Sequence, residues 1–471
     1  MKKIILFIIY ILLNSISYGQ NYGSWTETDS LNIARVWHAM VVLPNGNVLI
    51  SGNDIDSIQS SCEIYEMSTG KWRYTTPMNI PRTLHNLVLL NSGKILAVGG
   101  YKEQSCELFD PVTETWAMTD SIPTFRYWGQ TVTTLGDGKI LVAGGAYIDT
   151  VLWDVVYLDN LDIYDPNTDK WSIGAPMKIS RDWHTATLLN DGRMLISGGY
   201  NDSLEINECE IYNPQNNTWF TVSPMIEKRH THAAILLNNG NVFVSGGGFL
   251  LPGSKSCEVF NVDENQWSSV ADMWEYRSRH SIYYLAEINK LLILGGDQLP
   301  PTYADTWEIY DPDKLLPVYM ESFPINQVLI YNNIKLLNGS ILVAGNDEYI
   351  IPFFWASKRS WIFDVTTDVT ESNSKIKDFG LEQNYPNPFN PTTTISYTLQ
   401  SYVNVELKVY DVLGNEMNTL VNKSQPSGTY HINFDASGFS SGIYYYRLTI
   451  SNDGLSAGKS FQQVKKMVLI R

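Results

Sequence analysis

The chain has 471 residues, of which 12% are aromatic and 17% charged, so its composition is that of a folded protein with room for two or three domains. The formal net charge of −16 argues against nucleic-acid binding, because phosphate contacts need clustered lysine and arginine. Residues 20–371 hold 22 basic and 42 acidic residues, whereas residues 372–471 hold nine and seven. We therefore expect the last hundred or so residues to form a separate module.

Residues 1–19 have the pattern of a secretory signal peptide. A basic start and an apolar run from Ile4 to Leu13 precede small residues at Ser17 and Gly19. The run is too short to span a bilayer, and no other long apolar run follows. We expect cleavage between Gly19 and Gln20, export to the periplasm, and no transmembrane segment in the mature chain.

A unit of tight turn, apolar strand and glycine recurs seven times in the sequence that follows. Its clearest copy runs from Asn190 to Gly199, and the marker glycines of successive copies lie 45 to 54 residues apart. The markers are Gly52, Gly99, Gly144, Gly198, Gly246, Gly295 and Gly345. A period of about 40 to 50 residues is typical of one four-stranded unit per repeat. The sequence therefore predicts an all-β fold, with a seven-bladed β-propeller of four-stranded blades over residues 20–366.

The two ends of this region complement each other. The segment around Trp25 has the pattern of a fourth strand with no earlier strands before it, and the last copy ends at Asp364 after its third strand. We expect these segments to pair and close the ring, which removes an exposed sheet edge.

The repeat resembles the Kelch repeat. The resemblance is carried by the glycine pairs, by Tyr164-Asp165-Pro166 and Tyr310-Asp311-Pro312, and by a tryptophan that opens the fourth strand. That tryptophan is Trp72, Trp116, Trp171, Trp219 or Trp267 in five copies. Copies one and seven depart from the pattern, with Gly52-Asn53 and Gly345-Asn346 in place of the glycine pair, and copy six lacks the tryptophan.

Three kinds of chemically active side chain recur in register. We interpret them as framework, because an active site breaks the symmetry of a repeat. Each histidine is expected to form local hydrogen bonds within its own blade rather than a metal ring. The acids are expected to pair with the repeated arginines and help lock blades together, and the cysteines to be buried free thiols. They are His38, His85, His184, His232 and His280; Glu63, Glu107, Asp162, Glu210, Glu258 and Glu308; and Cys62, Cys106, Cys209 and Cys257. We predict no catalytic residues, no metal and no cofactor.

The loops between second and third strands differ from copy to copy and are rich in aromatic residues. Function is commonly carried by variable loops on a rigid scaffold, and aromatic side chains dominate binding hot spots. The predicted ligand-binding residues are Tyr147, Trp153, Tyr157, Phe249, Tyr303, Tyr349, Phe353, Phe354 and Trp355. The alternative for each of these rings is a place in the core between blades.

Residues 367–377 have the composition of a linker, and the strand and turn pattern of residues 378–471 predicts a small immunoglobulin-like β-sandwich. The run Asn384-Tyr385-Pro386-Asn387-Pro388-Phe389-Asn390-Pro391 and the later Ser-Gly-Ile-Tyr turn closely resemble the type A C-terminal sorting domain of the type IX secretion system. The resemblance implies that the secretion machinery handles residues 378–471. It also implies that the cargo is secreted or attached to the outer surface.

Short triplets of aspartate, serine or threonine, and an aliphatic residue lie in the predicted loops. They are similar to the O-glycosylation sequence of bacteria that use this secretion route. The acceptor residues are Ser30, Ser57, Ser121, Thr150 and Ser203.

The sequence favours an exported module that binds a protein or a glycan. The alternative is an enzyme, either similar to galactose oxidase, which belongs to the same structural group, or otherwise active on carbohydrates. Resemblance to that oxidase would require copper ligands that include an adjacent Tyr-His pair. The pair occurs here only as Tyr430-His431, outside the propeller region.

Overall fold

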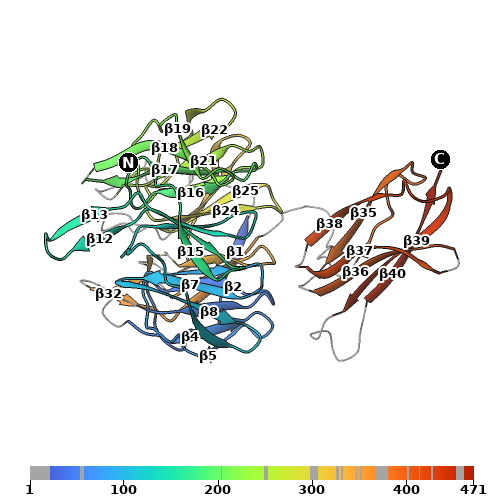
Figure 1. The fold of residues 1–471 in the computed structure, drawn as a ribbon, viewed down its shortest axis with the longest axis horizontal. Helices are drawn as coiled ribbons and strands as arrows, with labels where there is room; N and C mark the ends of the chain where they lie inside the picture. The colour runs from blue at the N-terminus through green and yellow to red at the C-terminus, as the bar shows by residue number, and fades with distance from the viewer. Residues whose placement is uncertain are drawn as a thin grey trace, which may run out of the picture. The chain divides into compact units, whose positions relative to one another are not determined.

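The computed structural model describes residues 22–470 apart from 54–57, 203, 249–252, 297–305, 325–327, 330–331, 346, 351–352, 366–379, 400–402, 413, 426–427 and 452–460. Contacts divide the chain into a first unit, residues 1–335 and 339–368, and a second unit, residues 336–338 and 369–471 (Figure 1). All regular structure in the described residues is β-strand, which confirms the all-β prediction. Across these residues no helix is long and apolar enough to cross a membrane. The predicted cleavage site at Gly19 and Gln20 lies outside the described residues.

The described part of the first unit contains seven four-stranded antiparallel sheets, one for each repeat. In six of them the four strands follow one another along the chain. Their bounds are β2 (Ala39–Val42), β3 (Val48–Ser51), β4 (Cys62–Glu66) and β5 (Lys71–Thr75); β6 (Asn86–Leu89), β7 (Ile95–Gly100), β8 (Glu103–Asp110) and β9 (Thr115–Thr119); β10 (Thr131–Thr134), β11 (Ile140–Ala143), β14 (Leu161–Asp165) and β15 (Lys170–Ile173); β16 (Thr185–Leu188), β17 (Met194–Asn201), β18 (Leu204–Asn213) and β19 (Thr218–Val222); β20 (Ala233–Leu236), β21 (Val242–Ser245), β22 (Cys257–Asn261) and β23 (Gln266–Val270); and β24 (Ser281–Leu285), β25 (Lys290–Leu294), β26 (Thr306–Asp311) and β27 (Leu316–Ser322).

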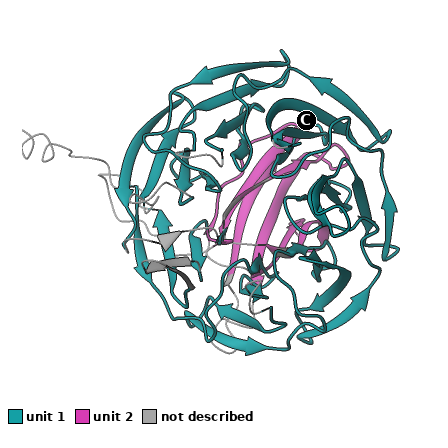
Figure 2. Ribbon diagram, turned by 90° about the vertical axis from the view of Figure 1, so that its left-hand side faces the viewer, with its two compact units in different colours: residues 1–335, 339–368 teal, residues 336–338, 369–471 magenta. Residues whose placement is uncertain are grey.

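The seventh sheet joins the two ends of the unit. It contains β29 (Asn333–Lys335), β30 (Ile341–Ala344), β33 (Ser360–Val365) and β1 (Gly23–Glu27). Strand β1 pairs antiparallel with β33, with Trp25 opposite Phe363, so the expected closure is confirmed. Figure 2 shows the sheets of this unit arranged as a ring, which is the propeller architecture that the repeats predicted.

The core of the ring lies between neighbouring sheets. All four residues of β3, β11 and β21 are buried. The fourth-strand tryptophans fill the outer part of these interfaces: Trp116 joins a cluster with Val41 and Leu49 of the preceding sheet, and its ring lies 5.0 Å from that of Phe109. The four cysteines are buried and free, as predicted.

The glycine pair marks a contact between neighbouring sheets. A Cβ at Gly198 would lie 2.4 Å from the carbonyl oxygen of Arg229 and 2.9 Å from Cε1 of His232, both in the next sheet. A Cβ at Gly199 would lie 2.8 Å from the carbonyl oxygen of Asp182. Both glycines also have positive φ, so any other residue would be strained as well as crowded.

Two smaller sheets extend from the ring. Strands β12 (Ala146–Asp149) and β13 (Asp154–Tyr157) form a hairpin, and β28 (Val328–Leu329), β31 (Asp347–Ile350) and β32 (Phe353–Ala356) form a three-stranded sheet. These are the two longest loop insertions that the sequence singled out.

The second unit contains two antiparallel sheets that enclose one core of buried apolar residues, in agreement with the predicted sandwich. One sheet has β34 (Gly380–Leu381), β35 (Thr392–Leu399) and β38 (Gly428–Asp435). The other has β37 (Glu416–Gln425), β36 (Val403–Tyr410), β39 (Gly442–Ser451) and β40 (Phe461–Leu469).

The asparagine- and proline-rich motif of this unit packs against its last strand. Asn384 is buried, and its backbone N–H donates to the Tyr446 hydroxyl at 2.7 Å. Phe389 is also buried, and its backbone N–H donates to the carbonyl oxygen of Val468 at 2.9 Å. The Tyr385 side chain is 82% exposed. The motif therefore has a structural part and an exposed part.

Candidate functional site: a funnel at the start of the first strands

Six buried ion pairs hold the approach to each first strand against the third strand of the same sheet. In the best-connected one, Arg229 Nη2 lies 2.8 Å from Glu258 Oε1, and Arg229 Nη1 donates to the carbonyl oxygens of Gly246 and Ser256 at 2.8 and 2.9 Å. Glu258 Oε2 also accepts from the backbone N–H of Ile226 at 2.7 Å. The other pairs are Arg35–Glu63, Arg82–Glu107, Arg126–Asp162, Arg181–Glu210 and Arg277–Glu308. The prediction that the repeated acids pair with arginines is confirmed, and these carboxylates are committed to the framework.

The repeated histidines join neighbouring sheets. His184 Nε2 lies 3.0 Å from Thr131 Oγ1 of the preceding sheet, and His280 Nε2 lies 2.7 Å from Ser245 Oγ in the same arrangement. Burial, reinforced by the nearby arginines, lowers the pKa of His85, His184 and His280 to about 3. These rings are therefore neutral at physiological pH and act as hydrogen-bonding spacers of the framework. The expectation that each bonds within its own blade is wrong, because their partners lie on the preceding sheet.

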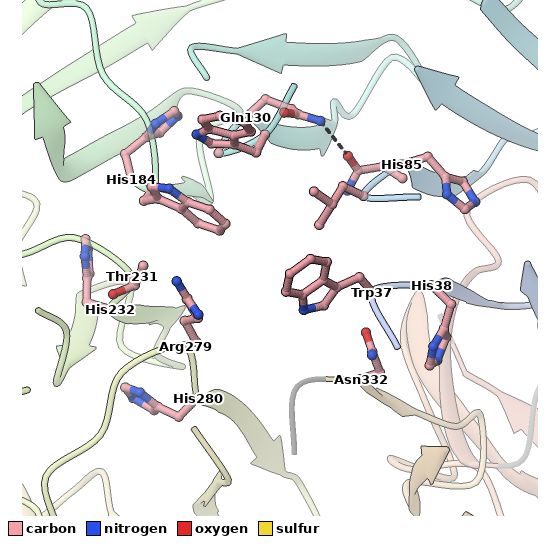
Figure 3. Close-up of a pocket in the computed structure, with 15 residues that line it drawn as sticks. Trp37, His38, His85, Gln130, His184, Thr231, His232, Arg279, His280 and Asn332 are labelled. Carbon is pink, nitrogen blue, oxygen red and sulfur yellow. Dashed lines mark hydrogen bonds between the residues drawn. The ribbon is translucent and has the colours of Figure 1, made fainter. Parts of the chain in front are cut away.

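A funnel with a volume of about 550 Å³ opens where the first strands begin (Figure 3). Its wall is formed by segments from all seven sheets and includes the indoles of Trp37, Trp128 and Trp183. Asn86, Gln130 and Asn332 add polar groups, and Gln130 Nε2 donates to Asn86 Oδ1 at 3.4 Å. The funnel therefore combines flat apolar surfaces with amide hydrogen-bonding groups.

One residue of each first-strand approach, directly before the repeated histidine or Gln130, forms what we call the ring position. The described ring residues all have positive φ, between 49° and 74°, and all line the funnel. They are Trp37, Leu84, Gly129, Trp183, Thr231 and Arg279. Backbone hydrogen bonds link successive members: the N–H of Thr231 donates to the Trp183 carbonyl at 2.8 Å, and the N–H of Arg279 donates to the Thr231 carbonyl at 2.8 Å. The backbone is thus fixed while the side chain differs from sheet to sheet.

The electrostatic character of the funnel comes from a single cation. The lining histidines are neutral, so Arg279 carries the formal charge among the described lining residues. Its guanidinium carbon lies 5.4 Å from the centre of the Trp183 ring, within the range of a cation–π contact.

Three of the aromatic residues predicted from the loops lie outside the funnel lining. Trp153 lies between β12 and β13 and is 82% exposed, and the rings of Tyr147 and Tyr157 pack against Phe125 and Tyr200 with centroid distances of 5.9 Å each. None of these three lines the funnel. Phe249 and Tyr303 lie outside the described residues, and Tyr349, Phe353, Phe354 and Trp355 lie in β31 and β32 with side chains that the structure leaves undescribed.

Three of the proposed O-glycosylation acceptors, Ser30, Ser121 and Thr150, are exposed. Ser57 and Ser203 lie outside the described residues.

Sequence reasoning gave too little weight to the ring position. Trp37 is 36% exposed, and Trp37 and Trp183 both line the funnel. The signal was present, because the residue before the repeated histidine changes from copy to copy while that histidine and the arginine three residues before it recur. A fixed position with a variable side chain indicates a surface adapted to a ligand.

Comparison with known families agrees with this architecture. Residues 37–247 match the KLHDC2/KLHL20/DRC7 Kelch-repeats domain, and residues 229–273 match the Kelch motif. The matched part of the ring, residues 37–273, therefore consists of Kelch repeats. Among curated proteins, the chain is 35% identical to Kelch-like protein 36 of Bos taurus over 116 residues and 32% identical to Kelch-like protein 23 of Homo sapiens over 114 residues. These matches cover 24% of this Kelch chain and only 18% and 19% of the relatives.

Residues 383–463 match the secretion system C-terminal sorting domain. This match indicates that the Kelch protein is exported through the periplasm to the outer surface or the medium. Among solved structures, a fungal alcohol oxidase of the AA5 family, determined in complex with copper, has a TM-score of 0.63 and 15% sequence identity. The similarity covers 95% of this chain and 100% of that one, and it shows a shared fold alone.

Proposed function

We propose that this exported Kelch propeller is a glycan-binding module whose ligand occupies the funnel. The observation that carries the proposal is the lining, in which Trp37, Trp128 and Trp183 stand beside amide side chains in a cavity of about 550 Å³. Small-molecule sites are typically concave, about 300 to 1,000 Å³ in volume and mainly apolar, with a few polar groups that fix orientation. The flat face of a sugar ring can stack on an indole while its hydroxyl groups reach the amides.

The domain organisation proposed from the sequence supports this role. A signal peptide over residues 1–19 would start export, the propeller would occupy residues 20–366, and a linker over 367–377 would join it to the sorting domain over 378–471. Binding would then take place outside the cell, where glycans of neighbouring surfaces are accessible.

The residues present do not fit a copper oxidase site. Four of the repeated histidines bond the hydroxyl groups of neighbouring sheets through Nε2, and burial keeps their pKa values low. Across the described ranges, no three histidine, cysteine or acidic side chains are grouped in the way that a metal site requires. The likeness to the AA5 oxidase therefore supports the propeller fold and leaves binding as the function that the funnel favours.

A glycan array probed with the full-length secreted protein tests this function. We expect a defined set of glycans to bind, with Trp183→Ala and Trp37→Ala each weakening binding about 5- to 150-fold, since stacking on an aromatic ring contributes about 1 to 3 kcal/mol. Trp153→Ala on the exposed hairpin is the matched control and should bind like the wild type. Absence of any bound glycan, or loss of binding only in the hairpin variant, would refute the funnel proposal.

A further inference from the structure

The residue directly before a ring residue occupies a second position, which we call the wall position and which lies behind the funnel lining at Thr83, Asp182 and Ser278. Wall residues include Thr83, Asp182 and Ser278, which precede the ring residues Leu84, Trp183 and Arg279. All three wall residues are buried, with exposed fractions of 0 to 3%. Because the ring is continuous, each wall residue lies against the ring residue of the preceding sheet.

Contacts between these two positions satisfy the polar groups of the wall in two places. Ser278 Oγ lies 2.8 Å from Oγ of Thr231, the ring residue of the preceding sheet. Thr83 Oγ1 donates to the carbonyl oxygen of the ring residue Trp37 at 3.5 Å. A hydroxyl group at the wall thus finds its partner across the boundary between sheets.

The wall residue Asp182 has no such hydrogen bond to the ring residue of the preceding sheet, which is Gly129. A Cβ built on Gly129 would lie 2.7 Å from Asp182 Cβ and 3.2 Å from Asp182 Oδ2, so the carboxyl group occupies the place where other sheets put a ring side chain. Gly129 has no side chain with which to form a hydrogen bond to it. Asp182 is only 2% exposed, and its Oδ1 has no hydrogen-bond partner in the part of the chain that the structure describes.

No cation compensates this carboxyl group among the described residues. The adjacent Arg181 guanidinium is committed to the Gly198 and Glu208 carbonyls at 2.7 Å each and to Glu210 at 2.9 Å. Burial, reinforced by the nearby Asp182 carboxyl group, raises the pKa of the Tyr157 phenol to about 12. A buried polar oxygen without a partner lowers the stability of the fold by about 1 to 3 kcal/mol, and by more when it is charged. Such a group is therefore a candidate for a functional role.

We propose that Asp182, which lies directly behind the gap left by the missing side chain at Gly129, is the residue that selects the ligand of the funnel by accepting hydrogen bonds from sugar hydroxyl groups. This assignment rests on the proposed glycan-binding function and adds a subsite to it. Trp183 follows Asp182 directly and lines the funnel, so a sugar stacked on that indole presents its edge to the carboxyl group. Carboxylates are strong acceptors for hydroxyl groups, and bonds to a charged acceptor contribute about twice as much as neutral ones.

Two kinds of variant on the full-length protein test the subsite with the glycan array and with thermal unfolding. Asp182→Asn keeps the shape but replaces one acceptor oxygen by a donor, and Asp182→Ser copies Ser278 at the equivalent wall position. Gly129→Ser supplies a hydroxyl group that fills the gap, as Thr231 does opposite Ser278. We expect each of these three variants to bind the glycans of the wild type with at least 10-fold lower affinity. Tyr74→Ala, on the exposed fourth strand β5, is the control that should change neither binding nor unfolding.

The outcomes separate this inference from the function on which it rests. If Trp183→Ala abolishes glycan binding but the Asp182 and Gly129 variants bind like the wild type, the Asp182 subsite is wrong. Glycan binding in the funnel would still be supported. Absence of glycan binding by the wild type would overturn both. Selective binding of glycans with a free amino group would show that Asp182 pairs with an ammonium group, and the assignment to hydroxyl groups would be wrong.

Discussion

Arg229 illustrates how a repeated residue holds the ring together. Its guanidinium and the carboxylate of Glu258 are each 1% exposed. Removing one partner of a buried pair leaves the other charge uncompensated, at a cost of about 3 to 5 kcal/mol. We expect Glu258→Gln to lower the free energy of unfolding by an amount in this range, measured by denaturant titration.

An exposed pair provides the control for this prediction. Arg73 lies 2.7 Å from Glu66, with side chains 40% and 32% exposed. Such surface pairs contribute about 0.2 to 1 kcal/mol, so Glu66→Gln should have a small effect. Equal losses for the two variants would contradict the framework role of the buried pairs.

Asp182 should also make the stability of the fold depend on pH. Burial raises the pKa of Asp182 to about 7 from the 3.8 of a free side chain, while the Trp128 side chain acts weakly in the opposite direction. The folded protein therefore holds this proton more tightly than the unfolded chain, so stability falls as pH rises from about 4 to about 7. At about 1.4 kcal/mol per pKa unit, the wild type should lose about 3 to 4 kcal/mol relative to Asp182→Asn between pH 4 and pH 8. A difference between the two proteins that stays constant with pH would show that the carboxyl group has an ordinary pKa.

At the scale of single elements, the double-glycine strand end is the feature that fits neighbouring sheets together. Gly198→Ala would place a methyl group against the Arg229 carbonyl and the His232 ring. Gly192 also has positive φ, but a Cβ there would meet nothing within 4 Å. Backbone strain alone costs about 1 to 2 kcal/mol, so Gly192→Ala should lose that amount and Gly198→Ala about 2 kcal/mol more. Similar losses in denaturant titrations would mean that backbone strain, and not contact between sheets, explains the glycine.

The elements also show what sequence can and cannot predict. The repeat spacing gave the strands, the closure by β1 and the ion pairs, because these depend on side chains that recur in register. The loop residues around Trp153 attracted attention because they differ between copies, yet that side chain extends into solvent. The funnel depends on the backbone at Trp37 and Trp183 adopting positive φ, which directs variable residues to one place, and a tryptophan in the sequence does not predict such a conformation.

At the scale of the whole ring, stability depends on joining its two ends. Trp25 of β1 packs against Phe323 and Phe363, with ring centroids 4.5 and 5.1 Å apart. Deleting residues 22–27 would remove these contacts and leave β33 without its partner. We expect the melting temperature to fall by about 10 °C or more and the protein to aggregate through the unpaired edge. Trp153→Ala, which removes a ring of similar size from an exposed hairpin, should leave the melting temperature unchanged; equal melting of the deletion variant and the wild type would contradict closure by β1.

The central claim is that the funnel, and not the loop hairpin, receives a glycan. A crystal structure of the propeller with the best glycan from the array tests it most directly. The account predicts a sugar ring stacked on Trp183, with a hydroxyl group within hydrogen-bond distance of Asp182. A glycan bound at the β12–β13 hairpin around Trp153, with the funnel free of sugar, would contradict it.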